Sequence, residues 1–331
     1  MDTHMTQLLI IKPSSLGDIV HGLQVASSLK AQQPDLRISW VVRDIFAPLV
    51  RACEAVDQTY VFRRDAGAKG FFELMSEVRE TKFDYAFDFQ GLFRTGLMMW
   101  RTRAKNKVGR SDAREGAWIF YKQLAPLPPG GRHAHALEIL LQFCPVFEAQ
   151  PELRGVLRFR APENLNLNFV DGRGGAKPLV MFPDSRRPEK RWGGYKELTE
   201  MLIRDGTGRK IVWAGNNYFP DKDAFPPAQF LNLTGNTSLV SLPALIQRAD
   251  WVISNDSGPM HLAAALGVRT LGIFGPTDPR RFGPYPLTAP TNHVVQAPVG
   301  DLKLLPAKEI FARFQRIDTP RTRIVRGRPT S

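Results

Sequence analysis

One segment, residues 251–279 (WVISNDSGPMHLAAALGVRTLGIFGPTDP), constrains the fold of this chain more than any other. Its apolar run at 251–253 predicts a strand, residues 260–266 predict a short helix, and residues 270–274 predict a second strand. Gly267 stands where glycine commonly ends a helix. Two strands joined by one helix predict a βαβ unit of a parallel sheet, because parallel neighbours need a crossover connection.

A cluster of polar residues follows the first of these strands, at the end where parallel sheets bind ligands. It consists of Asp256, Ser257, Gly258 and, one turn into the helix, His261. Each has a structural explanation, since the acid and the hydroxyl can cap the helix, the glycine can serve a turn and the imidazole can be half buried. Together they suit a sugar nucleotide, whose hydroxyls need polar partners and whose phosphates are favoured at helix N-termini.

The same alternation of strands and helices runs through the rest of the chain. We expect further strands at 8–12, 36–42, 58–62, 85–89, 179–182, 210–214 and 230–233. We expect further helices at 19–30, 48–53, 71–81, 135–144, 195–204, 239–247 and 307–317. This alternation predicts an α/β fold with doubly wound parallel sheets. Residues 105–132 are basic and in part proline-rich, and they lack this alternation. We expect this segment to leave the sheet and to lie beside the ligand site.

A domain boundary is expected within residues 154–177, which are poor in periodic apolar residues and rich in Gly, Pro and Asn. The full length of 331 residues suffices for two cores. The predicted parts are an N-terminal domain at 1–155, a linker at 156–177, a C-terminal domain at 178–318 that a final helix closes, and a basic tail at 319–331.

Composition and charge exclude several classes of protein. No apolar run approaches the roughly 20 residues that span a bilayer, and the N-terminus lacks the features of a secretory signal. Two distant cysteines, Cys53 and Cys144, favour a reducing cytoplasm. The net charge of +13 is concentrated at 94–132, with nine Lys/Arg against two acids, and at 313–331, with six against one. Such patches indicate nucleic acid, an anionic membrane or a phosphorylated substrate, although a solvated tail and loop would have the same composition.

The segment KPSSLGD, residues 12–18, follows the first expected strand. Ser15 and Asp18 have the spacing of a capping box, so both are explained as the start of a helix. The alternative is that Asp18 lies at the rim of the first sheet and takes a proton from an acceptor hydroxyl.

A charged loop, DSRRPEKRW at 184–192, follows the first strand of the second half. It is explained either as a solvated loop or as a diphosphate site, in which Lys190 and a neighbouring arginine neutralise the charge of a leaving group. The later turn at 233–239 (LTGNTSL) offers hydroxyls that can cap a helix or bind a ligand.

The pattern D-[ST]-G-x-x-H at 256–261, followed by GPTDP at 275–279, resembles glycosyltransferase family 9, the ADP-heptose:lipopolysaccharide heptosyltransferases. The resemblance implies a GT-B fold, in which two Rossmann-like doubly wound domains face each other across a cleft. Residues 12–18 match the segment K-x-S-[SA]-x-G-D that supplies the family's catalytic Asp, which makes Asp18 the expected base. Lys190 takes the place of the donor-phosphate lysine.

The remaining site follows from the same resemblance. The predicted donor-binding residues are Ser185, Arg187, Lys190, Thr237, Asp256, Ser257, Gly258 and His261. The predicted acceptor-binding residues are Ser15, Gly17, Arg63, Arg64, Gln90 and Arg94. The chain departs from the family at Arg186-Arg187-Pro188. It also departs where an acid commonly binds the donor ribose, since the residues here are Asn216, Asn217 and, later, Asp221.

The resemblance implies an inverting transfer of heptose from ADP-heptose to the Kdo of the lipopolysaccharide inner core, on a lipid A–Kdo acceptor. The segment DFQGL at 88–92 favours the first heptosyltransferase over the second. We expect a cytoplasmic enzyme, held by charge at the inner face of the inner membrane. No cofactor or tightly bound metal is expected, because no Asp-x-Asp motif follows a strand in donor position and the six His are scattered. The sequence indicates no oligomeric state.

Two other interpretations stay open. One is a family 9 transferase with a different sugar donor or acceptor, including the second heptosyltransferase. The other is a polyanion-binding protein on an inactive GT-B scaffold. Against the latter, Asp18 and residues 256–261 are intact, and aromatic residues do not interleave with the basic run as stacking surfaces would. Nucleic acid is therefore not expected as a partner.

Overall fold

The computed structural model describes residues 5–160, 177–217, 219 and 225–318. Its strands are β1 (Thr6–Ile11), β2 (Leu36–Arg43), β3 (Gln58–Phe62), β4 (Lys82–Asp88), β5 (Arg103–Arg110), β6 (Gln123–Ala125), β7 (Leu179–Phe182), β8 (Ile211–Gly215), β9 (Phe230–Thr234), β10 (Trp251–Asn255), β11 (Arg269–Phe274) and β12 (Asn292–Gln296).

The α-helices are α1 (Leu16–Gln32), α2 (Ala47–Ala52), α3 (Gly67–Glu80), α4 (Phe93–Arg101), α5 (Ala136–Leu141), α6 (Tyr195–Arg204), α7 (Leu242–Arg248), α8 (Gly258–Ala265), α9 (Pro279–Phe282) and α10 (Ala307–Ile317). Short 3₁₀ helices are η1 (Asp44–Phe46), η2 (Arg64–Ala66), η3 (Ala117–Phe120), η4 (Gly131–His133), η5 (Cys144–Phe147), η6 (Pro188–Lys190), η7 (Pro298–Gly300) and η8 (Leu302–Leu304).

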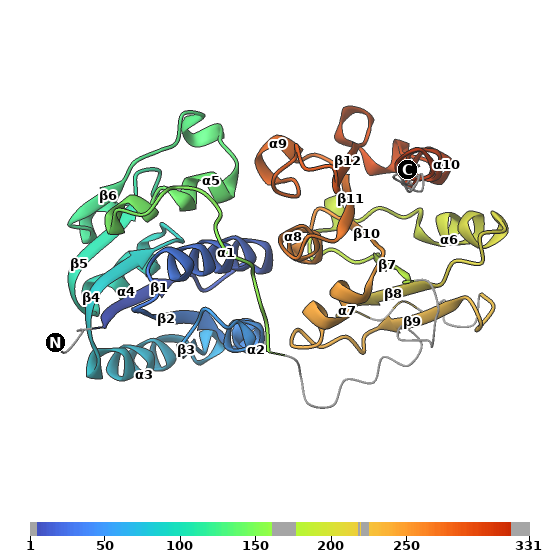
Figure 1. Cartoon of the computed structure of the whole chain (residues 1–331). Coiled ribbons are helices and arrows are strands. Elements are labelled where there is room, and N and C mark those ends of the chain that lie inside the picture. The colour runs from blue at the N-terminus through green and yellow to red at the C-terminus, as the bar shows by residue number, and fades with distance from the viewer. Residues whose placement is uncertain (1–4, 161–176, 218, 220–224, 319–331) are drawn as a thin grey trace, which may run out of the picture.

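The strands form two parallel six-stranded sheets, one in each half of the chain (Figure 1). The strand order is β3-β2-β1-β4-β5-β6 in the first sheet and β12-β11-β10-β7-β8-β9 in the second. In both sheets the order reverses beside the first strand of that half, which is the doubly wound Rossmann arrangement. The prediction of two Rossmann-like domains is confirmed.

Alternating side chains of the central strands supply two apolar layers in each domain. Along β1, Leu8 and Ile10 pack on the side of α1, whereas Leu9 and Ile11 pack on the side of α3 and α4. All four side chains are fully buried, and each stabilises the fold by about 1.5–3 kcal/mol. β7 repeats this pattern, with α7 and α8 on one face and α6 and α10 on the other.

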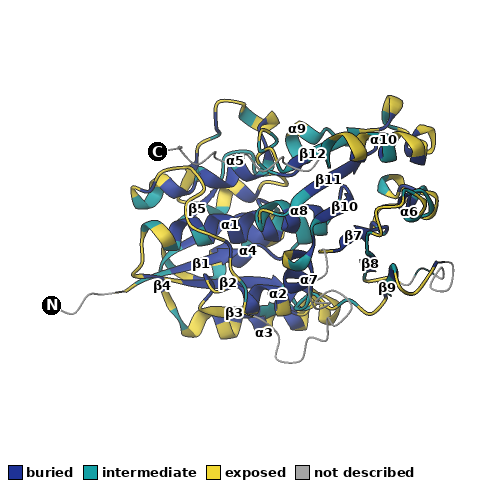
Figure 2. Ribbon diagram, turned by 45° about the vertical axis from the view of Figure 1, so that its right-hand side comes forward, coloured by how far each residue is buried: buried dark blue, intermediate teal, exposed yellow. Residues whose placement is uncertain are grey.

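The two domains share one apolar cluster. The cluster on the α1 side of the first sheet continues into the α7–α8 side of the second sheet. Helix α1 lies against α8 between the sheets (Figure 1), and the residues at this junction are mostly buried (Figure 2). The loops at the start of α1 and α8 are therefore brought together.

The structure corrects the expectation for residues 105–132. Instead of leaving the sheet, this stretch contains most of β5 and all of β6, which extend the first sheet beyond β4. The Lys and Arg side chains of β5 are largely exposed, so this strand lacks the apolar alternation on which strand prediction depends. Helix α4 and strand β12 also have no counterpart among the predicted elements.

Parts of the predicted linker and all of the predicted tail, residues 161–176 and 319–331, lie outside the described residues. The described start of the linker contacts the first domain, where Arg160 N donates to Ala52 O at 2.7 Å and Leu157 is buried. Within the described ranges, no helix has both the length and the apolar character to cross a bilayer.

Candidate active site between the two domains

Asp18 lies in the first turn of α1, just after the carboxyl end of β1. The backbone N and the Oγ of Ser15 both donate to Asp18 Oδ2, at 3.0 and 2.8 Å. The predicted capping box is therefore present. Lys12 Nζ lies 3.8 Å from the other oxygen, Oδ1, and the Asp18 side chain is still 42% exposed. The residue caps the helix and keeps an accessible carboxylate.

Lys12 controls the charge of Asp18. Partial burial by itself raises the pKa of Asp18, but the attraction of Lys12 and the hydrogen bonds from Ser15 outweigh it and hold this pKa well below its usual value. Burial lowers the pKa of Lys12, and the charge of Asp18 opposes that effect. Asp18 is consequently ionised at neutral pH.

Asp256 has the equivalent place in the second domain, directly after β10. Its Oδ2 accepts hydrogen bonds from Lys190 Nζ at 2.5 Å and Thr277 Oγ1 at 2.5 Å. The side chain of Asp256 is 5% exposed and that of Lys190 is 16% exposed. These residues follow the neighbouring strands β7, β10 and β11, so one edge of the sheet assembles them. A buried carboxylate needs such partners, and in turn it holds Lys190 in position.

Asn255, which sequence analysis did not single out, orders the Lys190 loop. Its Oδ1 accepts a hydrogen bond from Trp192 N at 3.1 Å, and its Nδ2 donates to Pro183 O at 3.0 Å. Both ends of the loop between β7 and α6 are thereby tied to β10. The only sequence signal is an amide at the end of a fully buried strand.

Two predicted site glycines permit the close approach of α1 and α8. A Cβ at Gly17 would lie 2.5 Å from the His261 ring, and a Cβ at Gly258 would lie 2.4 Å from the Leu16 side chain. A larger residue at either position requires the His261 ring, the Leu16 side chain or the two helices to move. Glycine is needed at these two positions because the other domain lies so close, and not because the backbone has a conformation that only glycine adopts.

His261 lies between the acidic residues of the two domains. Its pKa is lowered to about 4, chiefly by burial; Asp256 and Asp18 act to raise this pKa, whereas His135 and Lys190 act to lower it. The start of α1 packs directly on this imidazole, since a Cβ at Gly17, next to Asp18, would lie 2.5 Å from the His261 ring. The predicted base therefore lies beside the contact between α1 and α8, and the predicted donor-phosphate lysine binds the carboxylate that precedes α8.

Two further histidines, not predicted as site residues, adjoin His261. His21 Nε2 lies 3.1 Å from His261 Nδ1, and the His21 and His135 rings lie 5.3 Å apart between centroids. His135 Nε2 lies 3.1 Å from Gly283 O, so this ring too connects the domains. Burial lowers the pKa of His21 and of His135. The three histidines are far apart along the chain, so no sequence pattern indicated that they would meet.

On the acceptor side, Asp88 shapes the loop that carries Gln90. Asp88 Oδ1 accepts hydrogen bonds from Gln90 N at 2.9 Å and Gly91 N at 3.0 Å, and Oδ2 accepts one from Tyr121 at 2.8 Å. The Gln90 Oε1 atom is buried without a hydrogen-bond partner in the described structure. Arg110, which was not predicted, holds the neighbouring backbone by donating to Phe89 O at 3.2 Å.

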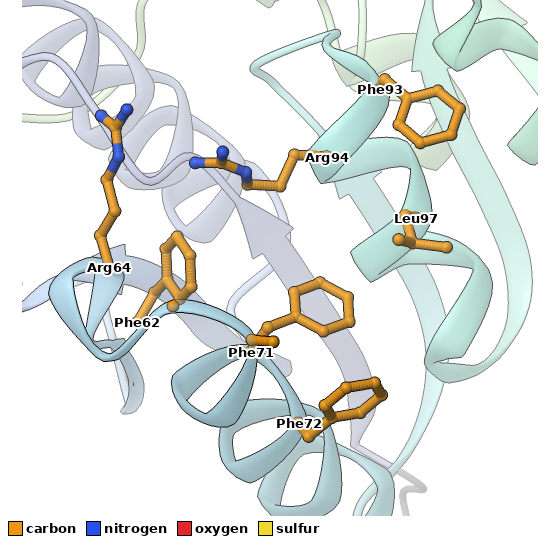
Figure 3. A pocket seen from close by; sticks show the side chains of 9 residues that line it. Phe62, Arg64, Phe71, Phe72, Phe93, Arg94 and Leu97 are labelled. Atoms are coloured by element: carbon orange, nitrogen blue, oxygen red, sulfur yellow. The ribbon is translucent and has the colours of Figure 1, made fainter.

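Arg63, Arg64 and Arg94 are exposed on the same domain. Arg64 and Arg94 border a cavity of about 520 Å³ between α3 and α4 (Figure 3). Its other side chains are apolar, and the Arg94 side chain extends toward Arg64, above the rings of Phe62, Phe71 and Phe72.

The other predicted donor residues have more local contacts. Ser185 is buried in the loop after β7. Arg187 is 62% exposed and lies 4.0 Å from Glu189. Thr237 Oγ1 donates to Leu233 O at 2.8 Å and accepts from Gly215 N at 3.3 Å, which joins β8 and β9. Ser257 Oγ lies 3.1 Å from Ser254 Oγ.

For the donor ribose, Asn217 contacts Asp184, whereas Asp221 lies outside the described residues. Among described residues, no group of three or more His, Cys, Asp or Glu is arranged to hold a metal ion. The ligand-binding role of each residue stays a prediction.

Comparisons with curated proteins show relatives in lipopolysaccharide synthesis. The lipopolysaccharide core heptosyltransferase OpsX of Haemophilus influenzae is 24% identical over 288 residues, covering 84% of this chain and 81% of that protein. Lipopolysaccharide heptosyltransferase 1 of Pseudomonas aeruginosa is 26% identical over 304 residues, covering 84% and 81%. Lipopolysaccharide heptosyltransferase 2 of Salmonella typhimurium is 26% identical over 291 residues, covering 82% and 84%.

Solved structures establish the fold. E. coli heptosyltransferase WaaC with ADP has a TM-score of 0.79 at 22% identity, covering 94% of this chain and 100% of that chain. WaaC with ADP-2-deoxy-2-fluoro heptose has a TM-score of 0.75 at 22% identity, covering 94% and 99%. The two domains thus have the predicted GT-B arrangement.

The profile of glycosyltransferase family 9 (heptosyltransferase) matches residues 71–300, which is more than half of the chain and includes parts of both domains. Together with the fold and the relatives, this match shows that the chain belongs to glycosyltransferase family 9 and is a transferase enzyme.

Proposed function

We propose that this enzyme transfers heptose from ADP-heptose to the Kdo of a lipopolysaccharide inner-core precursor, with inversion at the anomeric carbon. One observation carries the proposal: the start of α1, with Asp18, packs on His261 of α8, and Asp256, which binds Lys190, directly precedes α8. A proton acceptor and a phosphate-binding cation thereby belong to loops that meet where the two domains pack together. The activities named for the relatives, and the ADP and ADP-sugar bound to WaaC, support this choice of donor.

In the proposed step, the acceptor hydroxyl gives its proton to Asp18 while its oxygen bonds to the anomeric carbon. The bond from this carbon to the diphosphate breaks on the opposite face, and ADP leaves with the bonding electrons. Lys190 stabilises the negative charge that develops on the departing diphosphate. Asp256, which also accepts a hydrogen bond from Thr277, holds Lys190 beforehand, so no reorganisation of this cation is needed during the reaction.

The low pKa of Asp18 affects the timing of proton transfer. Lys12 keeps Asp18 in its base form throughout the physiological range, but a lowered pKa also makes the carboxylate a weaker proton acceptor. We therefore propose that the proton moves late, once bonding to the anomeric carbon has acidified the hydroxyl.

The acceptor is proposed to be lipid A that carries Kdo, as for the first heptosyltransferase, because the DFQGL segment at 88–92 matches that type. A second-heptose acceptor is the alternative, since a heptosyltransferase 2 is as similar to this chain as a heptosyltransferase 1. Either acceptor is anionic and fits the basic first domain. We place the enzyme in the cytoplasm, at the inner face of the inner membrane.

The test is transfer by the purified enzyme with defined substrates. ADP-heptose, UDP-glucose and GDP-mannose are each offered with Kdo–lipid A or with the same acceptor already carrying one heptose, and nucleotide release and the product are measured. We expect ADP release and an added heptose on Kdo–lipid A alone, with the anomeric configuration inverted. Transfer from another donor or only to the heptosylated acceptor contradicts the donor or acceptor assignment, and no transfer to either acceptor contradicts the proposed activity.

A further inference from the structure

One face of the first domain exposes large apolar side chains. We call it the α3–α4–η3 face, after the three helices that form it. Its exposed members and their exposed fractions are Phe72 (58%), Phe93 (46%), Trp100 (56%), Trp118 (62%) and Ile119 (57%). Helix η3 packs on α4, where the Phe93 and Phe120 rings lie 5.4 Å apart between centroids. Clustered exposed apolar residues of this size mark an interaction surface.

The same face is strongly cationic. Residues 93–122, from the start of α4 to just beyond η3, contain eight Lys/Arg and two acids, Asp112 and Glu115. Both acids have partners within the domain, since Asp112 binds Arg110 and Glu115 accepts a hydrogen bond from Phe93 N. Lys105 also pairs with Asp84, at 2.8 Å, so the other six Lys and Arg of this stretch provide the charge that an external anion can meet.

The cavity between α3 and α4 adds a third feature to this face. Phe62, Phe71, Phe72, Phe93 and Leu97 wall its volume of about 520 Å³. In Figure 3, the guanidinium groups of Arg64 and Arg94 lie together on one side, above the rings of Phe62, Phe71 and Phe72. An apolar interior with cations at one side matches an amphiphile that has an acyl chain and an anionic head group.

We propose that the α3–α4–η3 face docks on an anionic lipid bilayer, with the Trp118–Ile119 tip immersed in the interface and one lipid acyl chain in the α3–α4 cavity. Tryptophan concentrates at membrane–water interfaces, and nearby Lys and Arg attract anionic head groups. This assignment rests on the proposed function, in which the acceptor is itself an anionic lipid.

The sheet topology connects this face with the proposed catalytic site. Arg64 follows β3, Arg94 lies in the first turn of α4 after β4, and Asp18 follows β1, so all three lie at the carboxyl edge of the first sheet. A lipid whose acyl chain enters the cavity thus has its head group at the edge that also carries the proposed base. Docking would deliver the acceptor from the bilayer without full extraction into water.

Nucleic acid is the rival partner for an aromatic and basic surface, and the structure corrects one premise used against it. Trp100 and Trp118 do interleave with the basic run as exposed rings, and Arg101 lies 5.9 Å from the centre of the Trp100 ring. The cavity and the aliphatic side chain of Ile119 favour a lipid over nucleic acid as the partner. Bases stack on exposed aromatic rings, whereas an acyl chain can fill an apolar cavity between helices.

The experiment uses the tryptophans already present. The sequence has six Trp; Trp40, Trp192, Trp213 and Trp251 are at most 2% exposed, so only Trp100 and Trp118 can meet a lipid. The full chain is mixed with phosphatidylglycerol vesicles, with phosphatidylcholine vesicles and with single-stranded RNA, and brominated acyl chains serve as quenchers. We expect quenching and a blue shift with phosphatidylglycerol alone, weakened as salt shortens the Debye length from about 10 to about 3 Å.

A variant pair localises the contact. Trp118→Ser with Ile119→Ser is expected to lower phosphatidylglycerol binding by about tenfold or more, as loss of buried apolar area requires. Leu304→Ser, at an exposed site (54%) on the second domain, is the matched control and is expected to change nothing. Unquenched wild-type fluorescence, equal loss in both variants, or binding to RNA without binding to vesicles would overturn the proposal.

A soluble, deacylated Kdo acceptor separates this proposal from the proposed function. We expect the Trp118→Ser/Ile119→Ser variant to transfer heptose to it at the wild-type rate. Vesicle docking without any heptose transfer supports the surface and contradicts the proposed activity. Transfer to the soluble acceptor without vesicle docking supports the activity and contradicts the surface.

Discussion

The imidazole rings of His21 and His261, one from each domain, meet at 3.1 Å between Nε2 and Nδ1. One ring must donate and the other accept, so the contact requires at least one neutral imidazole. His135 adjoins the pair. Asp18 and Asp256 stabilise the protonated form of the His21–His261 pair, whereas Lys12 and Lys190 destabilise it. Burial has the largest effect on both pKa values, so the packed domains favour the neutral form of His21 and His261.

Acid should therefore weaken the protein. The folded-state pKa of His261 is lowered from 6.5 to about 4, so the unfolded state binds more protons between these values and stability is lost as the pH falls through this window. At pH 5 the loss from this residue is on the order of 2 kcal/mol. Denaturant unfolding at several pH values measures it. His261→Asn should flatten the dependence between pH 7 and pH 5, and the exposed His133→Asn should not. An identical pH dependence in all three proteins would refute this account.

Replacing Asp18 by Asn should separate chemistry from folding. The amide oxygen can still accept the hydrogen bonds from Ser15, so the cap of α1 survives. Turnover should fall by about 10²- to 10⁴-fold, which is the usual contribution of a general base. Steady-state kinetics and ADP titration measure the effect, with ADP affinity expected to stay within about twofold. Asp35→Asn, beyond the other end of α1, is the control; comparable turnover in both variants would remove Asp18 from the mechanism.

Two cations of one loop allow a matched comparison. Lys190→Ala should weaken ADP binding and lower turnover by about tenfold to a hundredfold, because a charge-assisted hydrogen bond contributes about 1.5–3 kcal/mol. Arg187, 62% exposed beside Glu189, should have a smaller effect when changed to Ala. Calorimetric ADP titration and kinetics compare the two. If Arg187→Ala has the larger effect, the diphosphate lies outside the Asp256–Lys190 pair.

A single methyl group should hold the domains apart. In Gly17→Ala the new Cβ would meet the His261 ring at 2.5 Å, so α1 and α8 must separate. Turnover should drop at least about tenfold, since small displacements of reacting groups are costly. ADP affinity should persist, because the proposed donor residues lie in the second domain. Small-angle scattering should show a larger radius of gyration than for Gly193→Ala, whose Cβ meets no atom within 4 Å. Equal radii and equal turnover would show that the interface absorbs the methyl group.

Much of the fold could be predicted because the required signals are local. The predicted helices at 195–204 and 307–317 coincide with α6 and α10, and the polar cluster lies directly after β10 as expected. The prediction failed at β5, where exposed basic side chains replace the apolar alternation of a buried strand, and at β6, which has only three residues, two of them exposed. Helix α4 was missed because Arg94 and Arg101 interrupt its apolar pattern in a basic region.

The sequence by itself determined the alternation of strands and helices, the cap formed by Ser15 and Asp18, and the motifs of the family, because periodicity and capping depend on neighbours within a few residues. Only the tertiary structure decided that Lys190 pairs with Asp256, 66 positions away, and that His21 meets His261, 240 positions away. Such contacts arise when separate strands end at one sheet edge and two domains bury a shared apolar surface. No local pattern specifies which distant residues will then lie within hydrogen-bond distance.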